Sequence, residues 1–590
     1  MKIPRNEHFL YFFAFLLALG LRLFALGSAP LSDFEADWAL QSFDLARNIS
    51  LIPDAQPGYV LPTTALFFLF QDANFTARLL PALAGSLLIF APYGFRRQLG
   101  QKAALILAFG LAIDPGLVTL SRLAGGPMPA IAFTVLALAL FAAPGGSRGT
   151  RGAWGGIAAG MALLSGAATI SGALGLGIAY GAARWTGLLA GSAETAETET
   201  AQNPARGSLP KRKITLFFGA GTVLLAGTLF FLYPQGLLSW AATLDAYLAL
   251  WQQGSDIPAG RLAAALFFYA ILPLIFGVAG AARGWLKKRA PERALSLWFL
   301  AALLLPLLMP GRQVGDIAWA LLPLWALAAL ELARYTRCDE QPLPGIGLAG
   351  GIFALMTIIW LTIAALDFAT PQSLPRYYIV VIASLLIGAL GTLLVAVSWS
   401  VKAARAGLVW GVSAGLIIYT LAAMFGASQV RANTPQEWWW PAPTPKHADL
   451  VSDTLADLGL VQSGRTDSLD VISLVDTPSM RWSLRNIEGV VYANAITMDT
   501  ALPVVIAHPN NPLPPIWEQL YRGQDFGWQQ SPGWETALPP NVINWLINRN
   551  APVVTDAIVI WARLDLFPSG TINPPEGVED INVDEALPAP

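Results

Sequence analysis

Long apolar runs, separated by short polar stretches, constrain this sequence of 590 residues more than any other feature. Each run approaches the roughly 20 residues that an α-helix needs to cross a bilayer. Only 13% of the residues are charged, which is too few to cover the surface of a soluble protein of this length. The sequence therefore predicts an integral membrane protein with about thirteen spans. These runs are 8–27, 77–95, 103–119, 128–143, 153–167, 170–187, 214–233, 260–282, 294–309, 316–333, 344–366, 376–398 and 406–426.

Basic residues in alternate loops predict the orientation of the spans. Cytoplasmic loops carry an excess of Lys and Arg, so an N-terminus inside the cell places every second loop on the basic side. The loops expected inside contain Arg96, Arg97 and Lys102, then Arg148 and Arg151, then Arg206, Lys211, Arg212 and Lys213, then Arg283, Lys287, Lys288, Arg289 and Arg293, then Arg334 and Arg337, then Lys402 and Arg405. We expect a plasma or inner membrane protein with a cytoplasmic N-terminus and an extracytoplasmic C-terminal domain. The Gly-rich pair at 153–187 could instead be one broken helix, which would reverse the side of the C-terminus.

The chain is expected to contain one large transmembrane domain and one small soluble domain. Residues 1–426 form the transmembrane domain, with a first extracytoplasmic loop at 28–76 that holds two interfacial helices and a flexible cytoplasmic loop at 188–213. Residues 427–447 read as a linker that contains an interfacial aromatic anchor, WWWP at 438–441, followed by a stiff Pro-rich spacer. Residues 448–573 are predicted to be a soluble extracytoplasmic domain, and residues 574–590 a disordered acidic tail.

The predicted C-terminal domain shows both helical and strand patterns. Helical spacing occurs at 449–460 and 541–547, and short apolar runs at 469–475, 502–507 and 557–561 are typical of buried strands. The fold class that follows is a mainly α polytopic membrane protein with a small C-terminal α/β domain.

Three carboxylates, Asp33, Glu35 and Asp37, follow the first span at the expected outer surface of the membrane. One interpretation is purely structural, because acidic residues favour the first turn of a helix and Ser32 could be its N-cap. The other is a general base or metal ligand that acts on the polar head of a lipid-borne substrate. The sequence leaves both interpretations open.

Further charged residues occur at the expected outer ends of apolar runs. Asp114, in AIDPGLVTLSRLAGG, is costly there unless it faces a wet cavity, and it could pair with the first acidic cluster or reach the headgroups. Arg122 and Arg312 lie in outside loops, where each could bind a phosphate or simply lipid headgroups. The three histidines are scattered and no HExxH or CxxC is present, so the sequence requires no cofactor and leaves a divalent metal undetermined. The net charge of −2 gives no reason to expect a nucleic acid partner.

The first outer loop and its neighbours resemble glycosyltransferase family 39. The resemblance rests on one anchor span, the acidic helix LSDFEADWALQSFDLARN, a second apolar surface patch, ANFTARLLPALAG at the next span, and AIDPGLVTLSRLAGG after it. It covers roughly residues 8–145. Family 39 belongs to the GT-C superfamily and is related to the protein O-mannosyltransferases and the lipid A aminoarabinose transferases.

The resemblance implies a membrane enzyme that moves a sugar, a hexose or a pentose, from a polyprenyl-phosphate donor to a protein, lipid or glycan acceptor with inversion, on the extracytoplasmic face. Family members show an adjacent Asp-Glu pair with Asp as the catalytic base, whereas Phe34 separates Asp33 from Glu35 here. We expect Asp33 or Glu35 to deprotonate the acceptor and Asp114 to assist. The residues expected to bind the lipid phosphate are Arg78, Arg122 and Arg312.

Two other functions remain possible on the sequence alone. A transporter or flippase of lipid-linked sugars would share the apolar grooves and outer arginines, although no repeated half is visible and the ionisable residues cluster at span ends. An inactive GT-C relative that acts as a membrane scaffold would explain the separated carboxylates.

Overall fold

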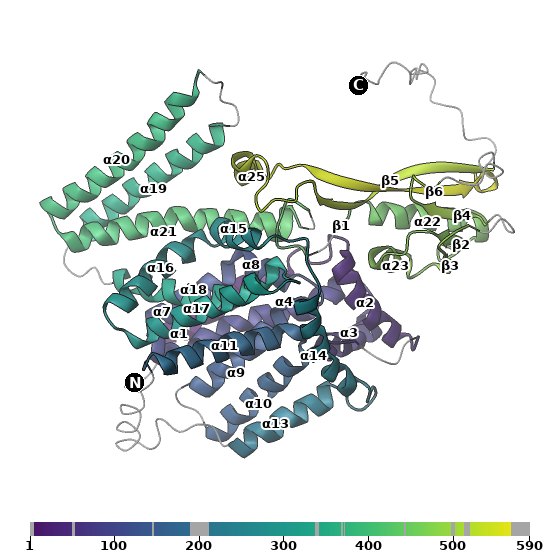
Figure 1. The fold of residues 1–590 in the computed structure, drawn as a ribbon, viewed down its shortest axis with the longest axis horizontal. Coiled ribbons are helices and arrows are strands. Elements are labelled where there is room, and N and C mark those ends of the chain that lie inside the picture. Colours follow the sequence, from purple (N-terminus) through teal and green to yellow (C-terminus); the bar gives the residue numbers. More distant parts are fainter. Residues whose placement is uncertain are drawn as a thin grey trace. The chain divides into compact units, whose positions relative to one another are not determined.

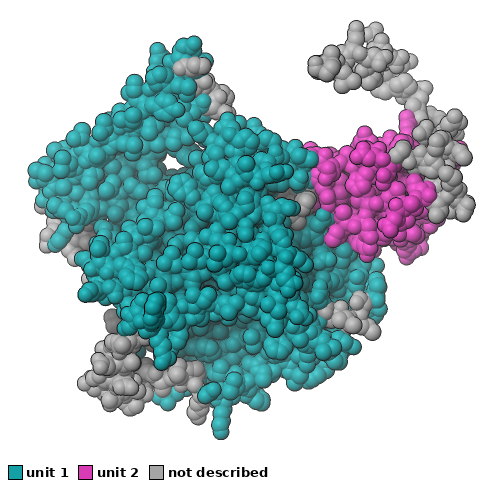
Figure 2. Space-filling model, in the orientation of Figure 1, with its two compact units in different colours: residues 1–444, 530–554 teal, residues 445–529, 555–590 magenta. Residues whose placement is uncertain are grey.

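The computed structural model describes most of the chain: residues 5–49, 54–143, 147–188, 212–336, 342–366, 370, 372–432, 434–441, 444–496, 502–511 and 520–567. Most of the predicted cytoplasmic loop at 188–213 and all of the predicted acidic tail at 574–590 lie outside these residues. The chain divides into two compact units, coloured teal and magenta in Figure 2. The first unit contains residues 1–444 and 530–554, and the second contains residues 445–529 and 555–590.

The first unit is built from α-helices (Figure 1). Its longer helices are α1 (Arg5–Leu23), α2 (Asp33–Ala46), α3 (Pro57–Phe70), α4 (Asn74–Leu87), α7 (Gln101–Ile113), α9 (Met128–Ala142), α10 (Arg148–Leu164), α11 (Ala167–Trp185), α13 (Arg212–Ala226), α14 (Gly236–Gln252), α15 (Ala259–Tyr269), α16 (Ile271–Leu286), α17 (Ala290–Leu308), α18 (Ala318–Leu332), α19 (Pro342–Ala365), α20 (Leu374–Ser398) and α21 (Val401–Phe425). Its short helices are η1 (Leu88–Phe90), α5 (Ala91–Gly94), α6 (Arg96–Leu99), α8 (Pro115–Ser121), η2 (Val314–Ile317), η3 (Ala333–Thr336), η5 (Gly426–Val430) and α25 (Val542–Asn548).

The helices confirm a polytopic integral membrane protein. Among the described residues, six helical segments are long and apolar enough to cross a membrane, and the number rises to nine if each of three bent helix pairs is one span. Two further apolar helices, α3 and α9, are shorter. The predicted total of about thirteen spans stays a prediction, as does the orientation of the termini.

Two of the predicted spans, 103–119 and 260–282, are each divided between two helices at a bend. The apolar run at 260–282 was expected to cross the membrane continuously, but α15 and α16 meet at Ala270 with a bend of 94°. Pro273 gives the physical reason, because in a continuous helix its ring would clash with the carbonyl of Tyr269 and it has no N–H to donate there. The breaks between α7 and α8 (56°) and between α10 and α11 (116°) lie at Asp114-Pro115 and at Ser165-Gly166.

The WWWP motif packs inside the protein, which corrects its interpretation as an interfacial anchor. Trp438, Trp439 and Trp440 are all buried. Trp438 stacks on Trp545 of α25 with ring centroids 4.3 Å apart, and the indole N–H of Trp545 donates to the carbonyl of Gln436 at 2.9 Å. A stacked pair of buried aromatic rings stabilises the packing by more than the area it buries. The segment 530–554 therefore groups with the helical unit and not with the rest of the predicted soluble domain, 448–573.

The second unit contains the predicted α/β elements. The helix and strands expected at 449–460, 469–475 and 502–507 correspond to α22 (Ala448–Ser463), β2 (Ser468–Ser473) and β4 (Val504–Ala507). β2 pairs in parallel with β4 and with β3 (Glu488–Tyr492), and β4 pairs antiparallel with β6 (Val553–Arg563), with Val505 opposite Trp561. The six-stranded sheet has the order β1-β5-β6-β4-β2-β3. The remaining elements are β1 (Thr444–Pro445), α23 (Pro478–Leu484), β5 (Tyr521–Pro532) and η6 (Leu564–Leu566).

Candidate active site

The acidic stretch after α1 forms α2, which begins with a complete capping box. The Ser32 hydroxyl accepts from the backbone N–H of Glu35, and the Glu35 carboxylate in turn accepts from the backbone N–H of Ser32 at 3.2 Å. This pairing satisfies two N–H groups that a helix start otherwise leaves without partners. The predicted N-cap at Ser32 is confirmed, and the helix start fixes Asp33 at its first position and Glu35 at its third.

Glu35 and Arg78 form a buried bidentate ion pair between α2 and α4. Nε of Arg78 lies 2.6 Å from Oε1 of Glu35, and Nη2 lies 2.7 Å from Oε2. Both side chains are almost completely shielded from solvent, with 0% of Glu35 and 2% of Arg78 exposed. A guanidinium matches a carboxylate in this two-bond geometry better than any other cation does.

The remaining polar atoms of this pair also have partners. Oε1 of Glu35 accepts from the backbone N–H of Ala124 at 3.1 Å, and Oε2 accepts from the Ser32 hydroxyl. Arg78 donates to the carbonyls of Leu26, Ala29 and Pro30 at 3.2, 2.7 and 3.0 Å. Five donors thus surround a carboxylate with about four lone-pair sites, so Glu35 has little capacity to accept a further hydrogen bond. Together these contacts tie the segment between α1 and α2 to the start of α4 and to the loop after α8.

Arg122 donates hydrogen bonds to backbone carbonyls at the C-terminal end of α1. Its Nη1 donates to the carbonyls of Arg22 and Phe24 at 3.0 and 2.7 Å, and its Nη2 donates to Ala25 at 3.0 Å. It is 3% exposed and interacts electrostatically with both Glu35 and Arg78. The structure therefore brings three of the predicted site residues, Glu35, Arg78 and Arg122, into one buried polar cluster.

Asp114 belongs to a separate buried network and does not pair with the acidic cluster of α2, contrary to one expectation. Its Oδ1 accepts from the backbone N–H of Leu117 at 2.9 Å as the N-cap of α8, and its Oδ2 accepts from the indole N–H of Trp325 at 2.7 Å. The charge that acts on it is Arg22 of α1. The kink before Pro115 points the carboxylate into the protein and away from the headgroups, because the helix start there needs a cap.

Arg22 was not singled out in the sequence, although a lone arginine at the end of an apolar run is a signal in itself. Its Nε donates to the Ser121 hydroxyl at 3.0 Å, and its Nη atoms donate to the carbonyls of Ala18, Leu111 and Ala112 at 3.3 Å. Gly85 makes room for this contact, because a Cβ there would lie 2.1 Å from the Ser121 oxygen. Trp325 was likewise missed, since nothing in an apolar span marks one tryptophan as the partner of a distant aspartate.

Two close backbone approaches pack α2 and η2 against α8 and the loop after it. Gly125 has a φ of +67° and lies against the ring of Trp38, so α2 packs directly on the loop after α8. Gly315 of η2 packs against Leu120. Arg312 precedes η2, donates from Nε to the carbonyl of Met309 at 2.9 Å and is half-buried. Within the described part of the chain, no hydrogen bond from its Nη2 is found.

Asp33 and Asp37 are both less buried than Glu35. Asp33 is half-buried at the first position of the helix. Asp37 is exposed as a residue, yet partial desolvation of its carboxyl group and then the neighbouring Asp54 carboxylate raise its pKa. A carboxyl group with a raised pKa accepts a proton more readily, as a general base must.

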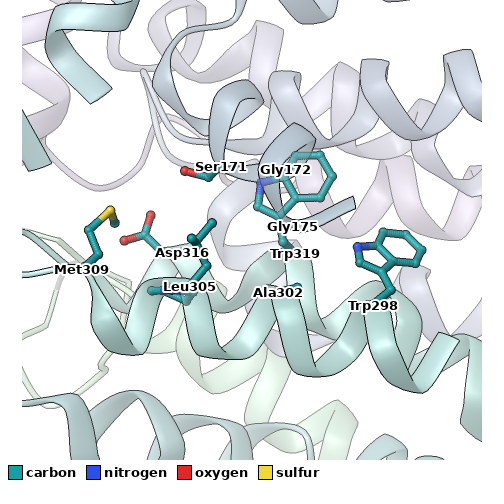
Figure 3. Close-up of a pocket in the computed structure, with 10 residues that line it drawn as sticks. Ser171, Gly172, Gly175, Trp298, Ala302, Leu305, Met309, Asp316 and Trp319 are labelled. Atoms are coloured by element: carbon teal, nitrogen blue, oxygen red, sulfur yellow. The ribbon is translucent and has the colours of Figure 1, made fainter. Parts of the chain in front are cut away.

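Asp316 is a further acidic residue at the end of a span that the sequence reasoning passed over. It lines a small pocket between α11, α17 and η2, together with Ser171, Gly172 and Trp319 (Figure 3). Its Oδ2 accepts from the backbone N–H of Gln313 at 2.8 Å. The cavity volume of about 10 Å³ is close to what one water molecule needs, so this pocket is too small for a sugar. Among the described residues, no group of three or more His, Cys, Asp or Glu side chains is arranged to hold a metal ion.

The model of the dolichyl-phosphate-mannose-protein mannosyltransferase family matches residues 57–185. This segment runs from α3 to α11 and includes Arg78, Asp114 and Arg122. It covers about a fifth of the chain. The match confirms the resemblance to the family 39 glycosyltransferases. The protein is therefore a polytopic membrane protein that is similar, over this segment, to membrane glycosyltransferases of the GT-C class. No curated protein matches the sequence.

Solved structures of membrane glycosyltransferases are also similar to the chain. ArnT from Cupriavidus metallidurans bound to undecaprenyl phosphate is 15% identical, with 86% of this chain and 94% of that chain covered and a TM-score of 0.47. The apo state of the same protein is 16% identical, with 80% and 84% covered and a TM-score of 0.48. The apo oligosaccharyltransferase of Archaeoglobus fulgidus is 15% identical, with 82% and 64% covered and a TM-score of 0.40.

Proposed function

We propose that the protein is a membrane glycosyltransferase that takes a sugar from a polyprenyl-phosphate donor and passes it, with inversion, to an acceptor on the extracytoplasmic face. The observation that carries this proposal is the buried cluster of Glu35, Arg78 and Arg122, two of whose residues lie in the segment matched by the mannosyltransferase family. The description of that family names a dolichyl-phosphate sugar as donor, which is one polyprenyl-phosphate sugar.

Asp33 is the general base in this proposal. It lies two residues before Glu35 at the start of α2, and it is half-buried whereas Glu35 is completely buried. The acceptor hydroxyl oxygen attacks the anomeric carbon of the donor, its proton passes to Asp33, and the bond between that carbon and the phosphate oxygen breaks. The phosphate leaves with the bonding electron pair, so the proposed reaction needs no co-reactant.

Positive charge near the leaving phosphate supports the same proposal. Arg312 is the predicted phosphate ligand with the fewest contacts to the protein, since its Nε bonds Met309 and its Nη1 reaches the carbonyl of Ile257 at 3.5 Å. Arg78 and Arg122 are held by carboxylate and carbonyl oxygens, so they contribute charge and position and little free hydrogen-bonding capacity. Fixed cations that face developing negative charge lower the barrier without reorganisation. Asp114 acts at a distance in this scheme, by fixing the kink that precedes Arg122.

The experiment is sugar transfer by the purified full-length protein in liposomes, with a panel of radiolabelled polyprenyl-phosphate sugars and a panel of acceptors. We expect transfer from at least one donor and a loss of at least about a hundredfold in Asp33→Asn, because general base catalysis contributes about 10²–10⁴-fold. Asp453→Asn, at an exposed position of α22, is the matched control. Lipid binding or transbilayer movement of the donor without transfer to any acceptor would contradict the proposal and favour a flippase or a scaffold.

A further inference from the structure

An apolar cavity of about 390 Å³ lies among α5, α6, α7, α9, α17 and α18. It extends from Pro291 at the start of α17 to Leu322 of α18 and to Leu111 in the last turn of α7. Among the described residues that line it, Gln98 alone has an amide or charged side chain. Its volume falls within the roughly 300–1,000 Å³ of sites that hold small molecules. A wall of this composition suits a hydrocarbon chain.

A second, polar pocket of about 550 Å³ adjoins the cavity at the face predicted to be cytoplasmic. Leu99 lines both, which makes them neighbours. The polar pocket presents three cationic side chains, Lys102, Arg289 and Arg334, against one carboxylate, Glu292. The pair of pockets therefore combines an apolar chamber with an entrance that carries excess positive charge.

The three cationic side chains differ in how closely they contact protein oxygen atoms. Arg334 is bound on two sides, at 2.7 Å by Glu292 and at 3.2 Å by Glu331. Arg289 is 49% exposed and reaches Glu292 only at 3.5 Å. Lys102 is exposed and donates to the carbonyl of Thr336 at 3.4 Å. Lys102 and Arg289 thus keep donors available to an anion, and the glutamates hold Arg334 in place.

We propose that the two pockets form one site for an anionic phospholipid of the inner leaflet. An acyl chain occupies the apolar cavity, and Lys102 and Arg289 bind the phosphate. Basic pockets between transmembrane helices on the cytoplasmic side are suited to anionic headgroups. The polar pocket lies at the start of α7, at the opposite end of that helix from Asp114, and the proposal does not depend on the proposed glycosyl transfer.

The experiment compares phosphatidylglycerol with phosphatidylcholine of the same acyl chains, added to the delipidated full-length protein in detergent. The readouts are the number of lipids retained in native mass spectrometry and the midpoint of thermal unfolding, which a ligand of the native state raises. Phosphatidylglycerol is expected to bind more tightly and to raise the midpoint more. Each basic residue near the phosphate is expected to change affinity about fivefold.

Two variants test the two halves of the site. Lys102→Gln with Arg289→Gln is expected to remove the preference for phosphatidylglycerol, whereas Lys402→Gln, an exposed lysine of another predicted inside loop, is expected to keep it. Ala294→Phe is expected to fill the cavity and weaken binding of both lipids, whereas Leu300→Phe, exposed on the same helix, is not. The double glutamine variant changes two surface side chains, so it tests the proposal even if Ala294→Phe does not fold.

Three results would overturn the proposal. One is equal binding of the two lipids by the native protein. Another is an undiminished preference for phosphatidylglycerol in the double glutamine variant. The third is displacement of phosphatidylglycerol by a polyprenyl phosphate at equal concentration, with the same sensitivity to Ala294→Phe, which would assign the cavity to the tail of the donor.

Discussion

Glu35 and Arg78 meet through two parallel hydrogen bonds of 2.6 and 2.7 Å although 43 positions separate them in the chain. The pair joins the first turn of α2 to the first turns of α4, and the N–H of Ala124 extends it to the loop after α8. Three segments of the candidate active site therefore depend on one buried ion pair.

Removal of one partner of this pair should destabilise the protein strongly. Arg78→Met leaves the Glu35 carboxylate buried without its counter-charge, which costs about 3–5 kcal/mol. Glu35→Gln should cost less, because the amide keeps the size of the side chain and one oxygen acceptor. The midpoint of thermal unfolding in detergent measures both effects. If Arg78→Met unfolded at the native midpoint, the pair would have no role in fixing the loop.

The contact between Trp325 and Asp114 should contribute measurably to stability. Trp325→Phe removes a buried charge-assisted hydrogen bond of 2.7 Å and is expected to cost about 1.5–3 kcal/mol. In the Asp114→Asn background the same change should cost less, because the acceptor is no longer charged. A double-mutant cycle on thermal unfolding gives the coupling. A coupling near zero would show that the two side chains do not depend on each other.

Trp545 should anchor segment 530–554 in the helical unit. Its ring is completely buried against Trp438 and Phe268, so Trp545→Ala is expected to cost about 3–5 kcal/mol and to expose the segment to protease. Trp399→Ala, 54% exposed, is the control and should change little. Limited proteolysis followed by mass spectrometry locates the cuts. Equal protection of the segment in both variants would disprove the anchoring role.

The acidic pair Asp37 and Asp54 should make stability depend on pH. Because the native pKa of Asp37 is raised, its ionised form is less stable in the folded state, and this contribution to stability falls as pH rises through the native pKa. Asp37→Asn should therefore raise the thermal midpoint at pH 7. At about pH 3, below the unfolded value of about 3.9, both states of the native protein are protonated and the difference should vanish. A difference of the same size at both pH values would contradict this.

Local features of this fold could be predicted from the sequence, whereas contacts between distant segments could not. Ser32 and Glu35 stand three residues apart, so the capping box was readable as a pattern, and the apolar strands of the second unit were found for the same reason. Trp325 lies 211 positions from Asp114 and Ser121 lies 99 from Arg22, so no spacing indicates either partner. The break before Pro273 was hidden by a continuous apolar run, although the proline itself was visible.

Only the structure gives a reason to prefer Asp33 over Glu35 as the candidate base. In the sequence, Asp33 and Glu35 are equivalent carboxylates at the start of one helix. The fold encloses Glu35 among donors from three segments and leaves Asp33 half-buried. This difference arises from tertiary packing of α2 on α4 and on the loop after α8, which no local pattern encodes.

The most direct test of the account compares Asp33→Asn with Glu35→Gln in three readouts: the rate of sugar transfer, the affinity for the polyprenyl-phosphate donor and the thermal midpoint. We predict that Asp33→Asn lowers the transfer rate by at least about a hundredfold while donor affinity and midpoint stay near the native values. Glu35→Gln should lower the midpoint together with the rate, because it removes the buried ion pair with Arg78. Full transfer by Asp33→Asn, or a loss of transfer in Glu35→Gln at an unchanged midpoint, would contradict the assignment of Asp33 as base and Glu35 as the residue that positions it.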